Sequence, residues 1–351
     1  MDLMLASTRA YSSLPVVGKH LEPFAGLTAM AMYGGHYAPA ALRARTARRA
    51  GAEPTAGSAG LPPFMLARGQ RRKWLYRKSI RYGSHPAQVL DVWRRPDLPT
   101  TPAPVLLFVP GGAWVQGTRV LQGHTLLATL VERGWVCVTM DYRVSPVHRW
   151  PRHIADVNAA IAWARANVDK YGGDRDFVAM AGCSAGGHLA ALAGLTAGDP
   201  AFRGEVAEDA DTSVDAVVGI YGRYDWQDRS TPTRANFMNF LERVVVRRSQ
   251  SRHPEVYRAA SPMARIHDGA PPFLIIHGDS DAIIPVAEAR QFHDALRMVS
   301  RAPVRYVELP RAGHAFDLVD AGHARRCADE TVRFLGEVHR YHVARSVLAA
   351  I

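Results

Sequence analysis

The sequence has 351 residues, 48% of them apolar, and a formal net charge of +11, so the chain is long enough to bury a large hydrophobic core. Its three cysteines, Cys137, Cys183 and Cys327, are widely spaced and odd in number, which argues against a disulfide framework and CxxC-type metal sites and favours a reducing, cytoplasmic location. Residues 1–100 contain 15 Lys or Arg against 5 Asp or Glu, whereas residues 101–351 contain 28 against 27. The basic character is therefore confined to the N-terminal part of the chain, and it does not indicate nucleic-acid binding.

The N-terminal segment, residues 1–70, is predicted to lie outside the main domain, either as an appended basic and apolar segment or as part of the cap. Residues 24–42 carry no Asp, Glu, Lys or Arg, but three glycines, a proline and a histidine make them too weakly hydrophobic for a membrane span of about 20 residues. The first residues lack the pattern of a secretory signal. The clusters 43-RARTARR-49 and 71-RRKWLYRK-78 indicate either a solvated basic face or peripheral contact with an anionic membrane surface, and both interpretations stay open. Residues 50–63, rich in Gly, Ala, Pro and Ser, are predicted to form a linker.

After the linker, the pattern predicts a β-hairpin and then strands alternating with helices. The hairpin strands are residues 74–82 and 88–93. Buried strands are predicted at 104–110, 135–143, 177–184, 214–222, 272–278 and 303–309, and helices at 119–133, 154–168, 185–197, 286–299 and about 321–347. This alternation predicts an α/β fold with a mostly parallel central sheet and helices on both faces, spanning residues 71–351. Residues 223–262 interrupt the alternation and are predicted to be an inserted cap.

The segment after the third buried strand, 182-GCSAG-186, places Ser184 between glycines where a strand passes into a helix. In an open α/β sheet, function gathers at the carboxyl ends of the strands. A G-x-S-x-G sequence in this context is typical of a nucleophile on a sharp turn, since side chains at Gly182 and Gly186 would clash there. The alternative is a tight turn that happens to carry a small polar residue. We predict that Ser184 is a nucleophile.

A nucleophilic serine needs a histidine base, and the base needs a carboxylate to orient it. His314 follows the sixth buried strand, where its imidazole can reach the end of the third strand. Two carboxylates after the fifth buried strand qualify by location, and Asp281 is preferred because Asp279 lies in the turn itself. Three nearby residues are interpreted differently: His277 as structural, His188 as packing and Asp317 as a helix cap.

The glycines of 110-PGGAW-114 follow the first buried strand and leave backbone N–H groups free to face the nucleophile. We predict that the N–H groups of Gly112, Ala113 and Ala185 form an oxyanion hole, with Ala185 at the start of the nucleophile helix. An ordinary Gly-Gly turn is the alternative. Aromatic residues nearby are candidates to line a substrate pocket, although each is equally consistent with core or cap packing: Trp114, Tyr221 and Tyr224.

Together these segments resemble an α/β-hydrolase carboxylesterase of the hormone-sensitive-lipase-like and feruloyl-esterase-like group, over residues 75–340. The resemblance is carried by the loop 110–114, 141-DYRVSP-146, 182-GCSAGGHLA-190, 277-HGDSD-281 and 313-GHAF-316. It implies a Ser184–His314–Asp281 triad that hydrolyses a small-molecule ester through an acyl-enzyme, with no metal or cofactor. The sequence departs from the family at Pro110, where the family has a histidine that orders the loop. Proline has no N–H and a fixed φ.

Two other functions are compatible with these residues. An amidase or arylformamidase uses the same machinery on an N-acyl bond and differs only in its pocket. A non-catalytic binding protein on a hydrolase scaffold is the second, but such a protein is expected to have lost the serine or the histidine. The sequence does not indicate an oligomeric state.

Overall fold

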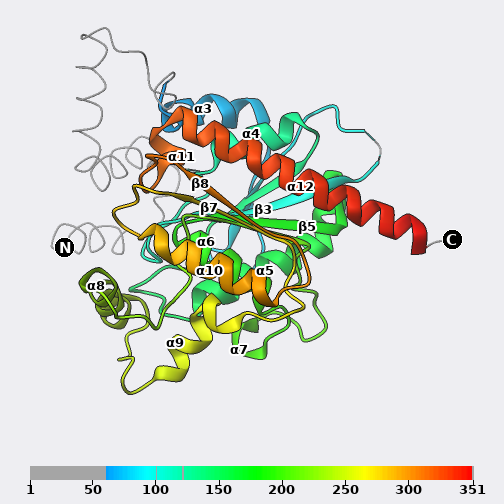
Figure 1. Ribbon diagram of the computed structural model, residues 1–351. Coiled ribbons are helices and arrows are strands. Elements are labelled where there is room, and N and C mark those ends of the chain that lie inside the picture. Colours follow the sequence, from blue (N-terminus) through cyan, green and yellow to red (C-terminus); the bar gives the residue numbers. More distant parts are fainter. Residues whose placement is uncertain (1–60, 100, 121, 350–351) are drawn as a thin grey trace, which may run out of the picture.

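The structure is a computed structural model that describes residues 61–99, 101–120 and 122–349 (Figure 1). Most of the predicted N-terminal segment, including the predicted linker up to residue 60 and the run 24–42, lies outside the described residues. The predicted membrane contact of that segment therefore stays a prediction.

A single eight-stranded sheet forms the centre of the described part of the chain, in the order β1-β2-β4-β3-β5-β6-β7-β8. The first two strands form the predicted antiparallel hairpin, β2 also pairs antiparallel with β4, and all other neighbours pair parallel. The predicted α/β fold with a mostly parallel sheet is confirmed. The strands are β1 Leu75–Arg81, β2 Val89–Trp93, β3 Ala103–Val109, β4 Val136–Met140, β5 Gly173–Cys183, β6 Ala216–Ile220, β7 Phe273–Gly278 and β8 Val304–Leu309.

Helices cover both faces of this sheet (Figure 1). Side chains of α5, α6 and α10 pack in one hydrophobic cluster and those of α4 and α12 in the other, with α3 lying beside α4. The helices are α3 Pro63–Trp74, α4 His124–Glu132, α5 Arg152–Asn167, α6 Ala185–Leu195, α7 Pro200–Arg203, α8 Pro232–Phe240, α9 Pro254–Ala260, α10 Val286–Val299, α11 Phe316–Val319 and α12 Ala321–Ala349.

The central strands read as continuous apolar runs because both of their faces are buried. In β3, Val105, Leu107 and Val109 belong to one cluster, whereas Leu106 and Phe108 belong to the other. Alternate side chains of a strand point to opposite faces, so a strand between two helical layers needs apolar residues at every position.

One helix was not predicted, and one predicted helix boundary is wrong. Helix α3 was not expected, because its basic sequence suggested an exposed face, yet Pro63 at its first turn is a helix-start signal. The helix predicted from residue 119 begins only at His124, after Gly123, which adopts a left-handed conformation with φ of 74°. The remaining predicted strands and helices are present with ends shifted by a few residues.

The insertion between β6 and β7 contains α8, a π-helical turn at Leu241–Val245, and α9. Its aromatic side chains reach the end of β3, where Trp226 and Phe237 contact Trp114 at ring-centroid distances of 4.9 and 5.9 Å. The insertion therefore packs against the glycine-containing loop that follows β3.

Candidate active site

Ser184 lies on a strained turn between β5 and α6. Its backbone has φ of 54° and ψ of −117°, a conformation that is rare for a residue with a side chain. A Cβ atom at Gly182 would lie 2.2 Å from the carbonyl oxygen of Gly186, and one at Gly186 would lie 2.1 Å from that of Val109. The two glycines thus allow a turn that is too tight for side chains on either side of the serine.

The structure brings His314 and Asp281 together with Ser184. The Ser184 hydroxyl donates to Nε2 of His314 at 2.9 Å, and Nδ1 of His314 donates to Oδ2 of Asp281 at 2.8 Å. His314 is 4% exposed. Because the carboxylate fixes the proton on Nδ1, Nε2 is free to accept the serine proton.

Asp281 is held as a charged carboxylate. Its Oδ1 accepts the backbone N–H groups of Ile283 and Ile284 at 2.8 and 2.9 Å, and its Oδ2 also lies 3.2 Å from Nε2 of His277. Burial opposes the charge, but the hydrogen bonds from His277 and His314 outweigh it and hold the pKa of Asp281 well below its usual range. An ionised carboxylate here can stabilise an imidazolium at His314 across the neutral range.

The other candidate carboxylates do not pair with the histidine in this way. Asp279 is exposed and accepts from the backbone N–H of Arg311 at 2.6 Å. Asp317 does not cap a helix as expected: the N-cap of α11 is Ala315 and makes no side-chain cap bond. Instead, the half-buried Asp317 carboxylate accepts the hydroxyl of Tyr221. Burial raises the pKa of Asp317, and the Tyr221 hydrogen bond opposes that rise.

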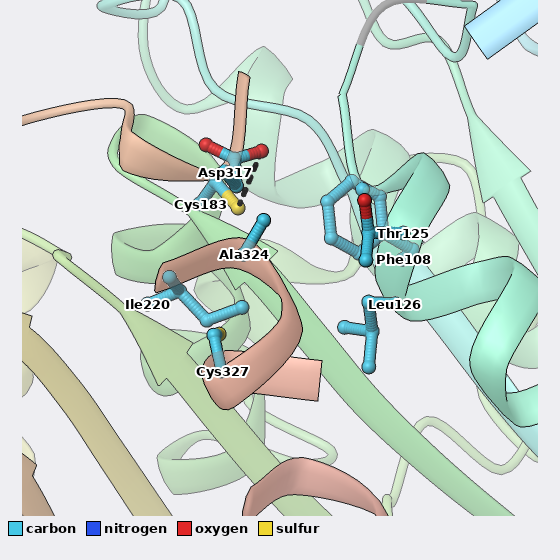
Figure 2. Close-up of a pocket in the computed structure, with 9 residues that line it drawn as sticks. Phe108, Thr125, Leu126, Cys183, Ile220, Asp317, Ala324 and Cys327 are labelled. Carbon is cyan, nitrogen blue, oxygen red and sulfur yellow. Dashed lines mark hydrogen bonds between the residues drawn. The ribbon is translucent and has the colours of Figure 1, made fainter. Parts of the chain in front are cut away.

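Sequence analysis did not predict the cluster behind the histidine. The ring of Tyr221 lies 4.7 Å from that of His314, and its hydroxyl connects to Asp317, which in turn lies 3.9 Å from Sγ of Cys183. Figure 2 shows Cys183 and Asp317 among the side chains that line a small pocket of about 10 Å³, the size of one water molecule. Burial raises the pKa of the Cys183 thiol well above its usual value, so Cys183 is an inert packed thiol.

The loop after β3 has an unusual backbone. Gly112, Ala113 and Trp114 have φ values of 133°, 53° and 58°. Within the described residues, the N–H groups of Gly112, Ala113 and Ala185 donate to no acceptor. Three unpaired backbone donors beside a serine are what an oxyanion hole requires.

The three aromatic pocket candidates are all buried. Trp114 packs edge-on against His188, at a centroid distance of 5.1 Å, and against Trp226. Tyr224 stacks on Phe292 of α10 at 4.3 Å, which is packing within the core. Of the three, only Tyr221 has a ring next to His314. Their assignment to a substrate pocket stays a prediction.

The other predicted roles of histidines can be compared with their contacts. Nε2 of His188 donates to the carbonyl of Ala260 at 2.8 Å, and its ring stacks on Trp226 at 4.4 Å, as expected for a packing residue. Burial lowers the pKa of His188 to about 3, so it is neutral. No group of His, Cys, Asp and Glu side chains among the described residues is arranged to hold a metal ion, and no helix in that part of the chain is both long and apolar enough to cross a membrane.

Comparisons with known proteins place this geometry among esterases. The BD-FAE family profile matches residues 90–296. Esterase LipC of Mycobacterium tuberculosis is 54% identical to this chain, and the match covers 97% of this chain and 92% of LipC. The probable carboxylic ester hydrolase LipM of the same organism is 46% identical, and the match covers 76% of this chain and 62% of LipM. Among solved structures, Thermogutta terrifontis esterase 2 phosphonylated by sarin has a TM-score of 0.64 and 22% identity, covering 75% of this chain and 95% of that chain. That structure supports the fold alone.

Proposed function

We propose that this chain, which belongs to the BD-FAE family of α/β-hydrolases and is a carboxylic ester hydrolase, works as a serine esterase with Ser184 as its nucleophile. The observation that carries the proposal is the hydrogen-bonded series from the Ser184 hydroxyl through His314 to Asp281, at 2.9 and 2.8 Å. This is the arrangement that activates a serine for attack.

In the proposed mechanism, Ser184 Oγ attacks the ester carbonyl carbon while its proton passes to Nε2 of His314. Asp281 stabilises the resulting imidazolium, and the N–H groups of Gly112, Ala113 and Ala185 bind the oxyanion. His314 then protonates the departing alcohol, which leaves an acyl group on Ser184. A water molecule repeats the sequence with His314 as base and releases the carboxylic acid. No metal or cofactor takes part in any of these steps.

We propose small-molecule esters of short to medium acyl chain as substrates. The rings of Trp226 and Phe237 pack against Trp114 on the loop after β3, and the chain-length series below measures which acyl length the site accepts. We also propose that the enzyme is cytoplasmic and that its N-terminal segment makes peripheral contact with a membrane. An N-acyl bond would be cleaved by the same residues, so amides and N-formyl compounds form a second arm of the test.

The test is hydrolysis of p-nitrophenyl esters from acetate to dodecanoate by the wild type and by Ser184→Ala. We expect turnover by the wild type and a loss of at least about a thousandfold in kcat in the variant. Ser280→Ala, which changes an exposed serine hydrogen-bonded to Asp279, is the matched control and should retain full activity. An alkyl fluorophosphonate should label the wild type once and leave Ser184→Ala unlabelled. Equal turnover by the wild type and Ser184→Ala would refute the proposal.

A further inference from the structure

The loop that carries the proposed oxyanion donors is strained and must be held by its surroundings. Ala113 and Trp114 are consecutive non-glycine residues with positive φ. Each such residue costs free energy and persists only where neighbouring groups fix it. The question is which side chains of this chain do so, since Pro110 has no N–H with which to anchor the start of the loop.

The far end of the loop is fixed through Trp114. Its side chain is buried, and its carbonyl accepts the backbone N–H of Ser145 at 2.8 Å and Nε2 of His153 at 3.1 Å. Burial lowers the pKa of His153 to about 3, so this donor is a neutral imidazole. These contacts leave the near end, at Pro110 and Gly111, to be held separately.

The near end is fixed by two side chains on opposite sides of the same peptide bond. The hydroxyl of Tyr142 donates to the carbonyl of Pro110 at 3.0 Å. The N–H of Gly111 donates to Oε1 of Gln122 at 2.5 Å, and Gln122 is only 7% exposed. The Pro110–Gly111 peptide is thus held by hydrogen bonds through both its carbonyl and its N–H.

This peptide lies directly against the nucleophile turn. A Cβ atom at Gly111 would be 2.6 Å from the carbonyl oxygen of Cys183 and 3.1 Å from Cβ of Ser184. A rotation of the Pro110–Gly111 peptide would therefore move the loop against the serine and redirect the next two N–H groups.

We propose that Gln122 is the positioning residue of the oxyanion loop in this enzyme. By accepting the Gly111 N–H, Gln122 orients the peptide that precedes Gly112. The N–H groups of Gly112 and Ala113 then remain directed to the substrate oxygen. The inference rests on the proposed function, because it concerns the stabilisation of a charge that develops on the ester carbonyl.

The test compares Gln122→Met with Gln88→Met. Methionine keeps the length and shape of glutamine but has no amide acceptor. Gln88 is also a buried glutamine, bonded to Asp156 at 2.8 Å, so the control makes the same chemical change elsewhere. Displacement of oxyanion donors by about 1 Å can cost about a hundredfold, so we expect Gln122→Met to lower kcat about 10- to 100-fold while KM changes less than about threefold.

Two further readouts separate positioning from loss of fold. The affinity of an alkyl trifluoromethyl ketone, which binds as an oxyanion, should fall by the same factor as kcat, whereas the fraction of sites titrated by the fluorophosphonate should stay at the wild-type value. The inference is overturned if kcat stays within about twofold, if the ketone affinity is unchanged, or if Gln88→Met gives the same kcat loss. Wild-type activity that depends on Ser184 tests the proposed function separately.

If Gln122→Met does not fold, Gln122→Leu carries the test, because it also removes the acceptor of the Gly111 N–H without adding a charge. We expect a loss of at least about tenfold in kcat with the same two readouts. A folded Gln122→Leu protein with a smaller loss would overturn the inference.

Discussion

Replacing Asp281 by asparagine removes the negative charge of the side chain and keeps its shape. The carboxylate lies 2.8 Å from Nδ1 of His314, and both groups are buried. At an effective dielectric constant of about 20, an ion pair at this distance is worth about 6 kcal/mol. Since about 1.4 kcal/mol corresponds to a factor of ten, loss of the charge at the moment when His314 becomes an imidazolium predicts a fall in kcat of about 10⁴.

The asparagine amide adds a second defect, because it can present an N–H to Nδ1 and favour the wrong tautomer of His314. The assay is steady-state hydrolysis of p-nitrophenyl butyrate by Asp281→Asn and by Asp279→Asn. Asp279 lies two residues away, and an asparagine there can still accept the Arg311 N–H, so kcat should stay within about threefold. A loss below about tenfold in Asp281→Asn, or equal losses in both variants, would refute the electrostatic argument.

Three other predictions concern stability. Gly186→Ala puts a Cβ atom 2.1 Å from a backbone carbonyl oxygen, so we expect the free energy of unfolding, measured in urea, to fall by about 3 kcal/mol or more. The control Gly69→Ala places its Cβ atom with no other atom within 4 Å, so it should leave the stability unchanged or raise it. Arg223→Met leaves the buried Glu288, its partner at 3.2 Å, without its counter-charge and should cost about 3–5 kcal/mol. The loss should be smaller when Glu288→Gln is added, because glutamine is neutral and still accepts the backbone N–H groups of Tyr224 and Asp225. Burial raises the pKa of Asp317, so the folded state keeps that proton to higher pH than the unfolded state. The contribution of Asp317 to stability should therefore fall as pH rises from about 4 through the raised pKa, and Asp317→Asn should gain stability relative to the wild type over that range.

Each of these outcomes has a result that would contradict it. A Gly186→Ala protein as stable as the wild type would mean that the nucleophile turn can open. A double variant of Arg223 and Glu288 that loses as much stability as Arg223→Met would show that packing, rather than charge pairing, governs the site. An Asp317→Asn effect that is the same at pH 3, below the unfolded-state pKa, and at pH 8 would exclude a raised pKa.

The sequence by itself determined the fold and the position of the proposed nucleophile. Runs such as residues 104–110 are apolar at every position, which only a strand buried on both faces requires, and their alternation with helices leads to a parallel sheet. The glycines around Ser184 indicate a turn that admits no side chains. These signals are local, so one short stretch of chain contains all the information.

Only the tertiary structure decided which distant groups meet. Asp279 and Asp281 differ in sequence by two positions, but the turn after β7 aims only Asp281 at Nδ1 of His314. Asp317 has the sequence signature of a helix cap and is instead bonded to Tyr221, 96 positions away. Gln122 has no motif around it, yet its amide oxygen meets Gly111. Hydrogen bonds between side chains on separate loops depend on how the strand ends are assembled, and no local pattern encodes that geometry.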